Sequence, residues 1–216
     1  MKRHILVYLI AISLIPAKAE LPSLQKGATT NSAPQTTENI PAIATDSVEL
    51  AQMYDEDQSD RRPQESIDWK VVQPRDRARE AMVKELYVAG RLKTGNDYYR
   101  AAMVLQHATR PEDFLLAHEL CVVAIFKGTD ARWLAAASED RFLRSIGRPQ
   151  RYGTQSNKIG DSPWSLGDVD ALVTDTLRME MKVPSLEDAK EQLAKRNEML
   201  ERAKKPSQQP QPTPAR

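Results

Sequence analysis

Apolar residues recur at intervals of three and four positions through the middle of this chain, and this periodicity limits the possible folds more than any other feature. One stripe lies within residues 78–89, a second within 98–108, a third within 111–128 and a fourth within 130–146. Side chains at these intervals lie on one face of an α-helix, so each stripe predicts an amphipathic helix. No segment shows a competing strand pattern. The sequence therefore predicts an all-α domain over residues 71–204.

Residues at the ends of these segments indicate where helices start and stop. Pro111 suits the first turn of the third helix, and Gly128 suits its end. A fifth helix is expected over 169–181, and Ser185 with Asp188 predicts a capping box for a sixth. Short links make the second, third and fourth helices antiparallel neighbours. A helical bundle and a degenerate tetratricopeptide-like array of helix pairs, with five or six helices, fit equally well.

The flanks of the helical domain differ from it in composition. Residues 1–19 combine a basic start, an apolar run of about eleven residues and a small-x-small sequence, a layout that predicts a cleaved signal peptide. Residues 20–70 and 205–216 are rich in polar residues and Pro, and they are predicted to be a disordered spacer and a disordered tail. The protein is therefore expected to be exported, periplasmic or secreted, with no stable membrane span after cleavage. An uncleaved N-terminal anchor is the alternative.

Charge excludes one class of function. The chain has 31 basic and 30 acidic residues, and three of the basic ones lie within the predicted signal peptide, which leaves a formal charge of −2. Nucleic-acid-binding domains are usually strongly basic, so a nucleic-acid partner is not expected. The single cysteine, Cys121, lies in an apolar helical run and is expected to be buried. A protein or peptide is the expected partner, and no cofactor is expected.

Two histidines follow the predicted signal peptide, His107 and His118, and they flank the expected turn between the second and third helices. With Glu119 or Asp140 they have the residue types of a metal site, but no ligand spacing enforces one, and none is predicted. Asp140 lies on the apolar fourth helix, where an ionised carboxylate needs a partner. Arg144, either histidine or the following loop can supply that partner.

The densest polar sequence is the loop 148–155 after the fourth helix. It contains, in order, Gln150, Arg151, Tyr152, Gly153, Thr154 and Gln155. Amide, phenol, hydroxyl and guanidinium groups beside a glycine are typical of a recognition loop. The same groups can also fold a loop back onto its own domain by bonding backbone groups. Both interpretations stay open.

Three short motifs together resemble a family signature. They are Gln106-His107 in the second helix, Asp140-Arg141 in the fourth, and Gln150-Arg151-Tyr152-Gly153-Thr154-Gln155 in the loop. With this combination, residues 75–160 are similar to a bacterial family of unknown function. The resemblance implies no activity, but it implies that the motif residues belong together.

The leading hypothesis is a noncatalytic exported module that binds a protein or peptide through the loop 148–155. It rests on the repeat-like helices, the polar flanks and the lack of a recognisable activated nucleophile. The first alternative is a small hydrolase-type enzyme in which His107 or His118 is the base and Asp140 orients it. The second alternative is a polar cluster whose role is purely structural.

Overall fold

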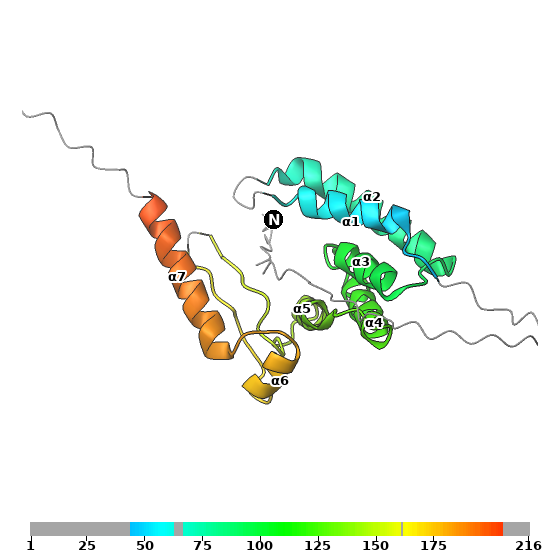
Figure 1. The fold of residues 1–216 in the computed structure, drawn as a ribbon. Helices are drawn as coiled ribbons and strands as arrows, with labels where there is room; N and C mark the ends of the chain where they lie inside the picture. The colour runs from blue at the N-terminus through cyan, green and yellow to red at the C-terminus, as the bar shows by residue number, and fades with distance from the viewer. Residues whose placement is uncertain (1–43, 63–66, 161, 205–216) are drawn as a thin grey trace, which may run out of the picture.

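The chain folds into helices joined by turns and by one long irregular segment (Figure 1), in a computed structural model that describes residues 44–62, 67–160 and 162–204. The helices are α1 (Val48–Ser59), α2 (Trp69–Val88), α3 (Gly95–Leu105), α4 (Pro111–Phe126), α5 (Arg132–Ser145), α6 (Asp175–Glu180) and α7 (Leu186–Lys204). Within these ranges the structure has no β-strand, only two isolated bridges, and the all-α prediction is confirmed. The predicted signal peptide and tail lie outside the described residues.

Helices α3, α4 and α5 form the centre of the fold, where α3 packs against α4 and α4 packs against α5. Short turns join them, so consecutive helices are neighbours, as the sequence predicted. Four alanines of α3 and α4 are fully buried in the shared core, and their small side chains let the backbones approach closely: Ala101, Ala102, Ala117 and Ala124. Leu105 is also fully buried, and burial of such a side chain stabilises the fold by roughly 1.5–3 kcal/mol.

Both ends of α4 and the start of α7 follow local signals in the sequence. Helix α4 begins at Pro111 and is followed by Gly128, whose φ of 87° lies in the left-handed region that favours glycine. At the start of α7, the Ser185 hydroxyl accepts a hydrogen bond from the backbone N–H of Asp188, at 3.1 Å. The predicted starts of these two helices are therefore confirmed.

The predicted disordered spacer over 20–70 is wrong for its described part, because residues 48–59 form α1 and α2 begins at Trp69. Helix α1 packs on α3 and α2 (Figure 1), with Leu50 and Met53 buried in the core. Its other buried positions are polar, and they include Asp57 and Gln58. A composition-based argument counts such residues as solvated, and it therefore missed this helix.

The predicted fifth helix over 169–181 is also too long, since only α6 forms there. The backbone before α6 is hydrogen-bonded to the loop that follows α5. Gln150 N–H donates to Asp168 O at 3.0 Å, and Asp170 N–H donates to Gln150 O at 2.6 Å. Thr174 then caps α6, its hydroxyl accepting from Leu177 N–H. Pairing with the distant loop thus displaces the helix start.

Helix α7 is attached through the irregular segment between α5 and α6 (Figure 1). Trp164 N–H donates to Asn197 Oδ1 at 2.9 Å, Asn197 Nδ2 donates back to Trp164 O at 3.0 Å, and the Arg196 guanidinium lies 4.6 Å from the Trp164 ring centroid.

None of the described helices combines the length and the apolarity that crossing a bilayer demands.

Candidate functional site

Asp140 organises the loop that follows α5. Its side chain is 0 % exposed, and its Oδ1 accepts from the backbone N–H groups of Arg151 at 2.7 Å and Tyr152 at 2.9 Å. Its Oδ2 accepts from the N–H of Thr154 at 2.8 Å and from the Thr154 hydroxyl at 2.7 Å. Of the partners that the sequence left open for Asp140, the loop is therefore the one that the structure selects.

A second set of hydrogen bonds in the same loop joins its two glutamines. Gln155 N–H donates to Gln150 Oε1 at 2.7 Å, and Gln150 Nε2 donates to Gln155 O at 2.9 Å and also to Leu166 O. Gly153 has a φ of 74°, and a Cβ there would lie 3.4 Å from Val169, in ordinary van der Waals contact. The backbone conformation, more than lack of space, favours glycine at this position.

Most of the side chains expected to form a recognition surface are therefore inside the protein. Gln150, Tyr152, Gly153 and Gln155 are buried, Arg151 and Thr154 are half-buried, and Arg148 and Pro149 are exposed. Two of the buried groups form part of the support: Gln155 Nε2 donates to Ala137 O at 3.4 Å, and Tyr152 packs with Ala136, Val173 and Val183. The loop residues that remain accessible are Arg148 and Pro149, which are exposed, and Arg151 and Thr154, which are half-buried.

On the other side of α5 lies a buried charge cluster that we define by Asp57, Arg61, Asp76, Arg79 and His107. Arg61 Nη1 lies 2.9 Å from Asp57 Oδ1 and its Nη2 lies 2.8 Å from Asp76 Oδ2. Arg79 Nη2 lies 2.8 Å from Asp76 Oδ1. Each carboxylate has a cationic partner, which a buried charge requires. The cluster ties α1 to α2 and, through His107, to the end of α3.

His107 is held near the carboxylate of Asp57, with Nε2 at 3.4 Å from Asp57 Oδ2. Burial lowers the pKa of His107 below its ordinary value; Asp57 opposes this shift, while the charges of Arg61 and Arg141 add to it. Burial alone opposes ionisation of Asp57, but His107 and Arg61 together lower the pKa of its carboxyl. Asp57, and not Asp140, is thus the carboxylate beside this imidazole, and the orienting role predicted for Asp140 is wrong for His107.

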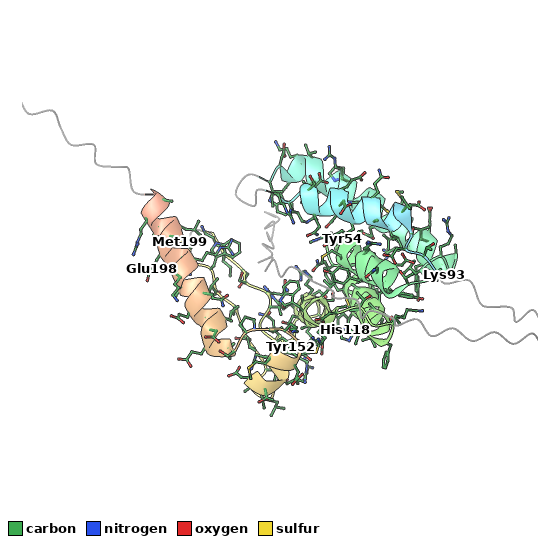
Figure 2. The ribbon with its side chains drawn as sticks, viewed as in Figure 1. Tyr54, Lys93, His118, Tyr152, Glu198 and Met199 are labelled. Carbon is green, nitrogen blue, oxygen red and sulfur yellow. The ribbon has the colours of Figure 1, made fainter. Side chains whose placement is uncertain are left out.

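His118 lies on the opposite, loop-facing side of the centre, and Figure 2 shows it and Tyr152 beside α5. Its Nδ1 lies 3.0 Å from the carbonyl oxygen of Ala135. Glu139 is close by, and Arg151 Nε lies 3.5 Å from Glu139 Oε1. Burial raises the pKa of Glu139, whereas His118 and Arg151 lower it, and Asp140 raises it further. We call His118, Glu139 and Arg151 the outer polar face.

The sequence-predicted residues thus separate into three groups. Asp140 and the loop residues from Gln150 to Gln155 form one hydrogen-bonded unit. His107 belongs to the charge cluster, next to the buried Gln106 and within electrostatic reach of Arg141. Arg141 Nη1 and Gln155 Nε2 both donate to Ala137 O, which links these two groups. His118 belongs to the outer polar face, and Glu119 is an exposed residue of α4 outside all three.

Sequence reasoning missed the carboxylate and guanidinium groups of the charge cluster, and it also missed Glu139. A signal was present in the spacing, because Asp57 and Arg61 are four residues apart and Asp76 and Arg79 are three apart, as in helical ion pairs. The predicted spacer over residues 20–70 covers Asp57 and Arg61, so the sequence prediction did not include the partner that Asp76 has across the helices.

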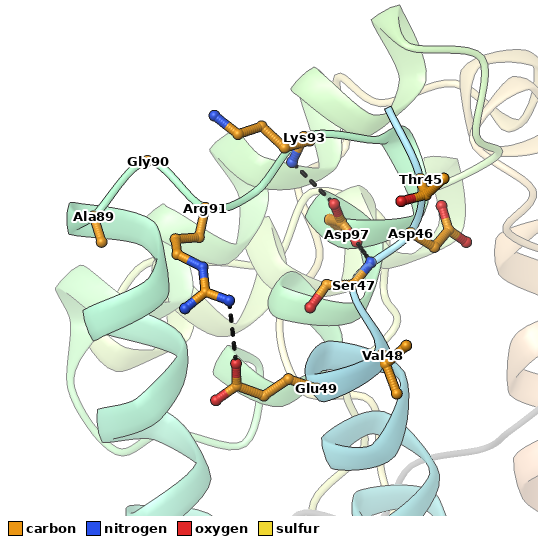
Figure 3. Close-up of a pocket in the computed structure, with 10 residues that line it drawn as sticks. All are labelled: Thr45, Asp46, Ser47, Val48, Glu49, Ala89, Gly90, Arg91, Lys93 and Asp97. Atoms are coloured by element: carbon orange, nitrogen blue, oxygen red, sulfur yellow. Dashed lines mark hydrogen bonds and ion pairs between the residues drawn. The ribbon is translucent and has the colours of Figure 1, made fainter. Parts of the chain in front are cut away.

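A separate groove of about 570 Å³ lies between the start of α1 and the turn from α2 to α3 (Figure 3). Asp97 closes one side, since its carboxylate accepts from Ser47 N–H at 2.7 Å and from Lys93 N–H at 2.9 Å. Arg91 Nη2 and Glu49 Oε2 lie 3.8 Å apart across the groove. These contacts fasten α1 to the bundle, and the groove contains none of the residues that the sequence put forward.

Among the described residues, no three His, Cys, Asp or Glu side chains are grouped so that they could hold a metal ion.

Comparison of the chain with protein-family models, with curated proteins and with solved structures finds no match. The resemblance drawn from the three motifs therefore stays a prediction.

Proposed function

We propose that the protein is an exported, noncatalytic helical module that binds a polypeptide at the outer polar face and the adjoining exposed part of the loop, Arg148 and Pro149. The proposal keeps the function expected from the sequence and moves the contact surface from the buried loop side chains to the groups beside them. The observation that carries it is the set of four hydrogen bonds from the loop to Asp140.

A loop held in one conformation loses little entropy when it binds, so more of the contact energy appears as affinity. Asp140 fixes the backbone at Arg151 from one side, and Arg178 Nη2 donates to the carbonyl of Arg151 from the other, at 3.4 Å. The Arg151 side chain is still 38 % exposed. A fixed backbone with an accessible guanidinium favours recognition, because it presents hydrogen-bond donors in one set position.

Cross-linking from the loop tests this function. Cys121 is buried, so Arg148→Cys gives the chain one exposed thiol for a benzophenone-maleimide label. We expect irradiation in an extracytoplasmic extract to give a discrete adduct with one polypeptide. The matched control is Val88→Cys, at an exposed position (83 %) on the last residue of α2. Export is checked by sequencing the N-terminus, which is expected to start at Glu20.

The same adducts from both labels, or none from position 148, contradict polypeptide binding at this face. An unprocessed N-terminus contradicts the signal peptide without bearing on the binding site.

A second candidate function is acid–base catalysis by His107 with Asp57 as the orienting carboxylate. It is favoured by the 3.4 Å separation of Nε2 and Oδ2 and by the lowered pKa of the imidazole, which keeps His107 unprotonated and able to accept a proton near neutral pH. Chromogenic ester and phosphoester substrates test it. Hydrolysis that falls about 100-fold or more in His107→Gln supports this function, and hydrolysis unchanged by that substitution contradicts it.

A further inference from the structure

We propose that the polypeptide ligand inserts a lysine or arginine side chain at the outer polar face, between Glu139 and His118. This inference rests on the binding function proposed above and names the chemistry of its ligand. It follows from which hydrogen-bonding groups of this face are already used and which are not.

Glu139 is an acceptor with too few donors. Its side chain is 27 % exposed, and its one ion pair among the described residues is the 3.5 Å contact with Arg151 Nε. Charge-assisted hydrogen bonds to carboxylates are usually about 2.7–2.9 Å long, so this contact is loose. The neighbouring carboxylate of Asp140, in contrast, has four short bonds. Glu139 therefore has free acceptor capacity at a half-buried position.

His118 supplies a second acceptor. A carbonyl oxygen can only accept, so the 3.0 Å contact with Ala135 O places the imidazole proton on Nδ1. In the neutral ring Nε2 then carries a lone pair. An ammonium group has three N–H donors and a guanidinium has five, so either one has enough donors for both Glu139 and His118.

The charges around the face also favour a cation. Carboxylates come from α5 at Glu139 and Asp140 and from the irregular segment at Asp170, while His118 faces from α4 and Arg151 from the loop with Tyr152. The Asp140 carboxylate is already used by the loop, so the accessible carboxylates of this face are those of Glu139 (27 % exposed) and Asp170 (29 % exposed), with the Arg151 guanidinium between them. Arg151 Nη1 lies 3.3 Å from Asp170 Oδ2, so Arg151 keeps an ionic partner when a ligand cation takes Glu139.

Titration with short peptides tests the ligand chemistry. The probes are acetylated and amidated Gly-Gly-X-Gly-Gly, in which X is lysine, arginine, norleucine or glutamate, added to the isotope-labelled full chain and followed by amide chemical shifts. We expect the lysine and arginine peptides to shift the amides of Glu139 and Arg151, and the norleucine and glutamate peptides to leave them unchanged. Glu139→Gln should weaken binding of the lysine peptide at least fivefold.

The control is Glu119→Gln, which removes an exposed carboxylate next to His118 in sequence and should leave the affinity unchanged. Equal binding of the norleucine peptide, or equal losses in the Glu119 and Glu139 variants, overturns the proposal. If no basic peptide binds while the adduct from position 148 persists, only the ligand chemistry is wrong. If basic peptides bind and no adduct forms, the cation site stands and the polypeptide-binding function fails.

Discussion

The charge cluster and the loop around Asp140 are both buried and polar, but they are held together in different ways. In the charge cluster the partners are side chains from α1, from α2 and from the turns that follow α1 and α3, as in the pairs of Arg61 with Asp57 and Asp76. In the loop one carboxylate collects backbone N–H groups from Arg151, Tyr152 and Thr154. The first arrangement joins separate helices, and the second fixes the path of one segment. Removal of one carboxylate from each should therefore have different consequences.

The largest effect is expected for Asp140→Ala. It leaves three backbone N–H groups and a hydroxyl without their acceptor, and a buried donor that loses its partner costs roughly 1–3 kcal/mol. Because the loop can partly open to water, we expect a total loss of about 3–4 kcal/mol in the free energy of unfolding, measured by urea denaturation. Asp140→Asn keeps one oxygen and should lose about 1–3 kcal/mol.

Proteolysis adds a second readout to this variant, since an opened loop should be cut after Arg148 or Arg151 by trypsin. An Asp140→Ala protein with the stability and cleavage pattern of the parent would show that the four bonds do not hold the loop.

A smaller effect is expected for Asp57→Ala in the charge cluster. Arg61 loses its 2.9 Å partner but keeps the 2.8 Å contact with Asp76, so its charge is not left alone. We expect a loss of about 2–3 kcal/mol, below the roughly 3–5 kcal/mol for a buried pair broken outright. In Asp57→Ala the protease sites of the loop should stay protected, because no residue of α1 takes part in the four hydrogen bonds to Asp140. Loop cleavage in this variant would show that the four bonds to Asp140 do not hold the loop without the charge cluster.

The same contrast explains how much the sequence could predict. Helices α3 and α4, the capping of α7 and the need of Asp140 for a partner follow from spacing within one segment, so they were predictable. For helix α1 the spacing of Asp57 and Arg61 gave only a weak signal, because their burial depends on partners far along the chain, Asp76 of α2 and His107 after α3. The late start of α6 has a similar cause, since residues 168–170 pair with Gln150.

The candidate site was predictable in its residues but not in its grouping. A sequence shows that His107, His118 and Asp140 are polar residues in apolar helices, but it does not show which face each one occupies. The structure puts Asp57 beside His107, Ala135 O beside His118 and the loop around Asp140. Side-chain direction on neighbouring helices decides this, and it depends on packing across the whole bundle.

A pH dependence of stability should distinguish the charge cluster from the loop. Burial lowers the pKa of His107 below its ordinary 6.5, so the unfolded chain takes up a proton first as the pH falls. The contribution of His107 to the free energy of unfolding is complete above pH 6.5 and is lost progressively below it. The loss is no more than about 1.4 kcal/mol per pH unit. Glu139, whose pKa is raised, contributes with the opposite sign, so the test is the difference between the parent and His107→Gln. Identical slopes between pH 7 and 5.5 would exclude this role of His107.

The smallest effect is expected at Asp46, which anchors the start of α1 to α3. Its carboxylate accepts from Thr94 Oγ1 at 2.7 Å, Asn96 Nδ2 at 2.8 Å and Arg100 Nη1 at 3.1 Å, and the bonds from Thr94 and Asn96 are the main cause of its lowered pKa. The side chain is 38 % exposed, so solvent screening limits the loss in Asp46→Asn to about 0.5–1 kcal/mol at neutral pH. A carboxyl with a lowered pKa stabilises the fold above its unfolded value of 3.8, and the gain is lost as the pH falls through the folded pKa. The difference between parent and variant in the free energy of unfolding, measured in urea, should therefore persist at pH 5 and shrink below pH 3.8. A difference that stays constant through this range would mean that the charge of Asp46 does not hold α1 in place.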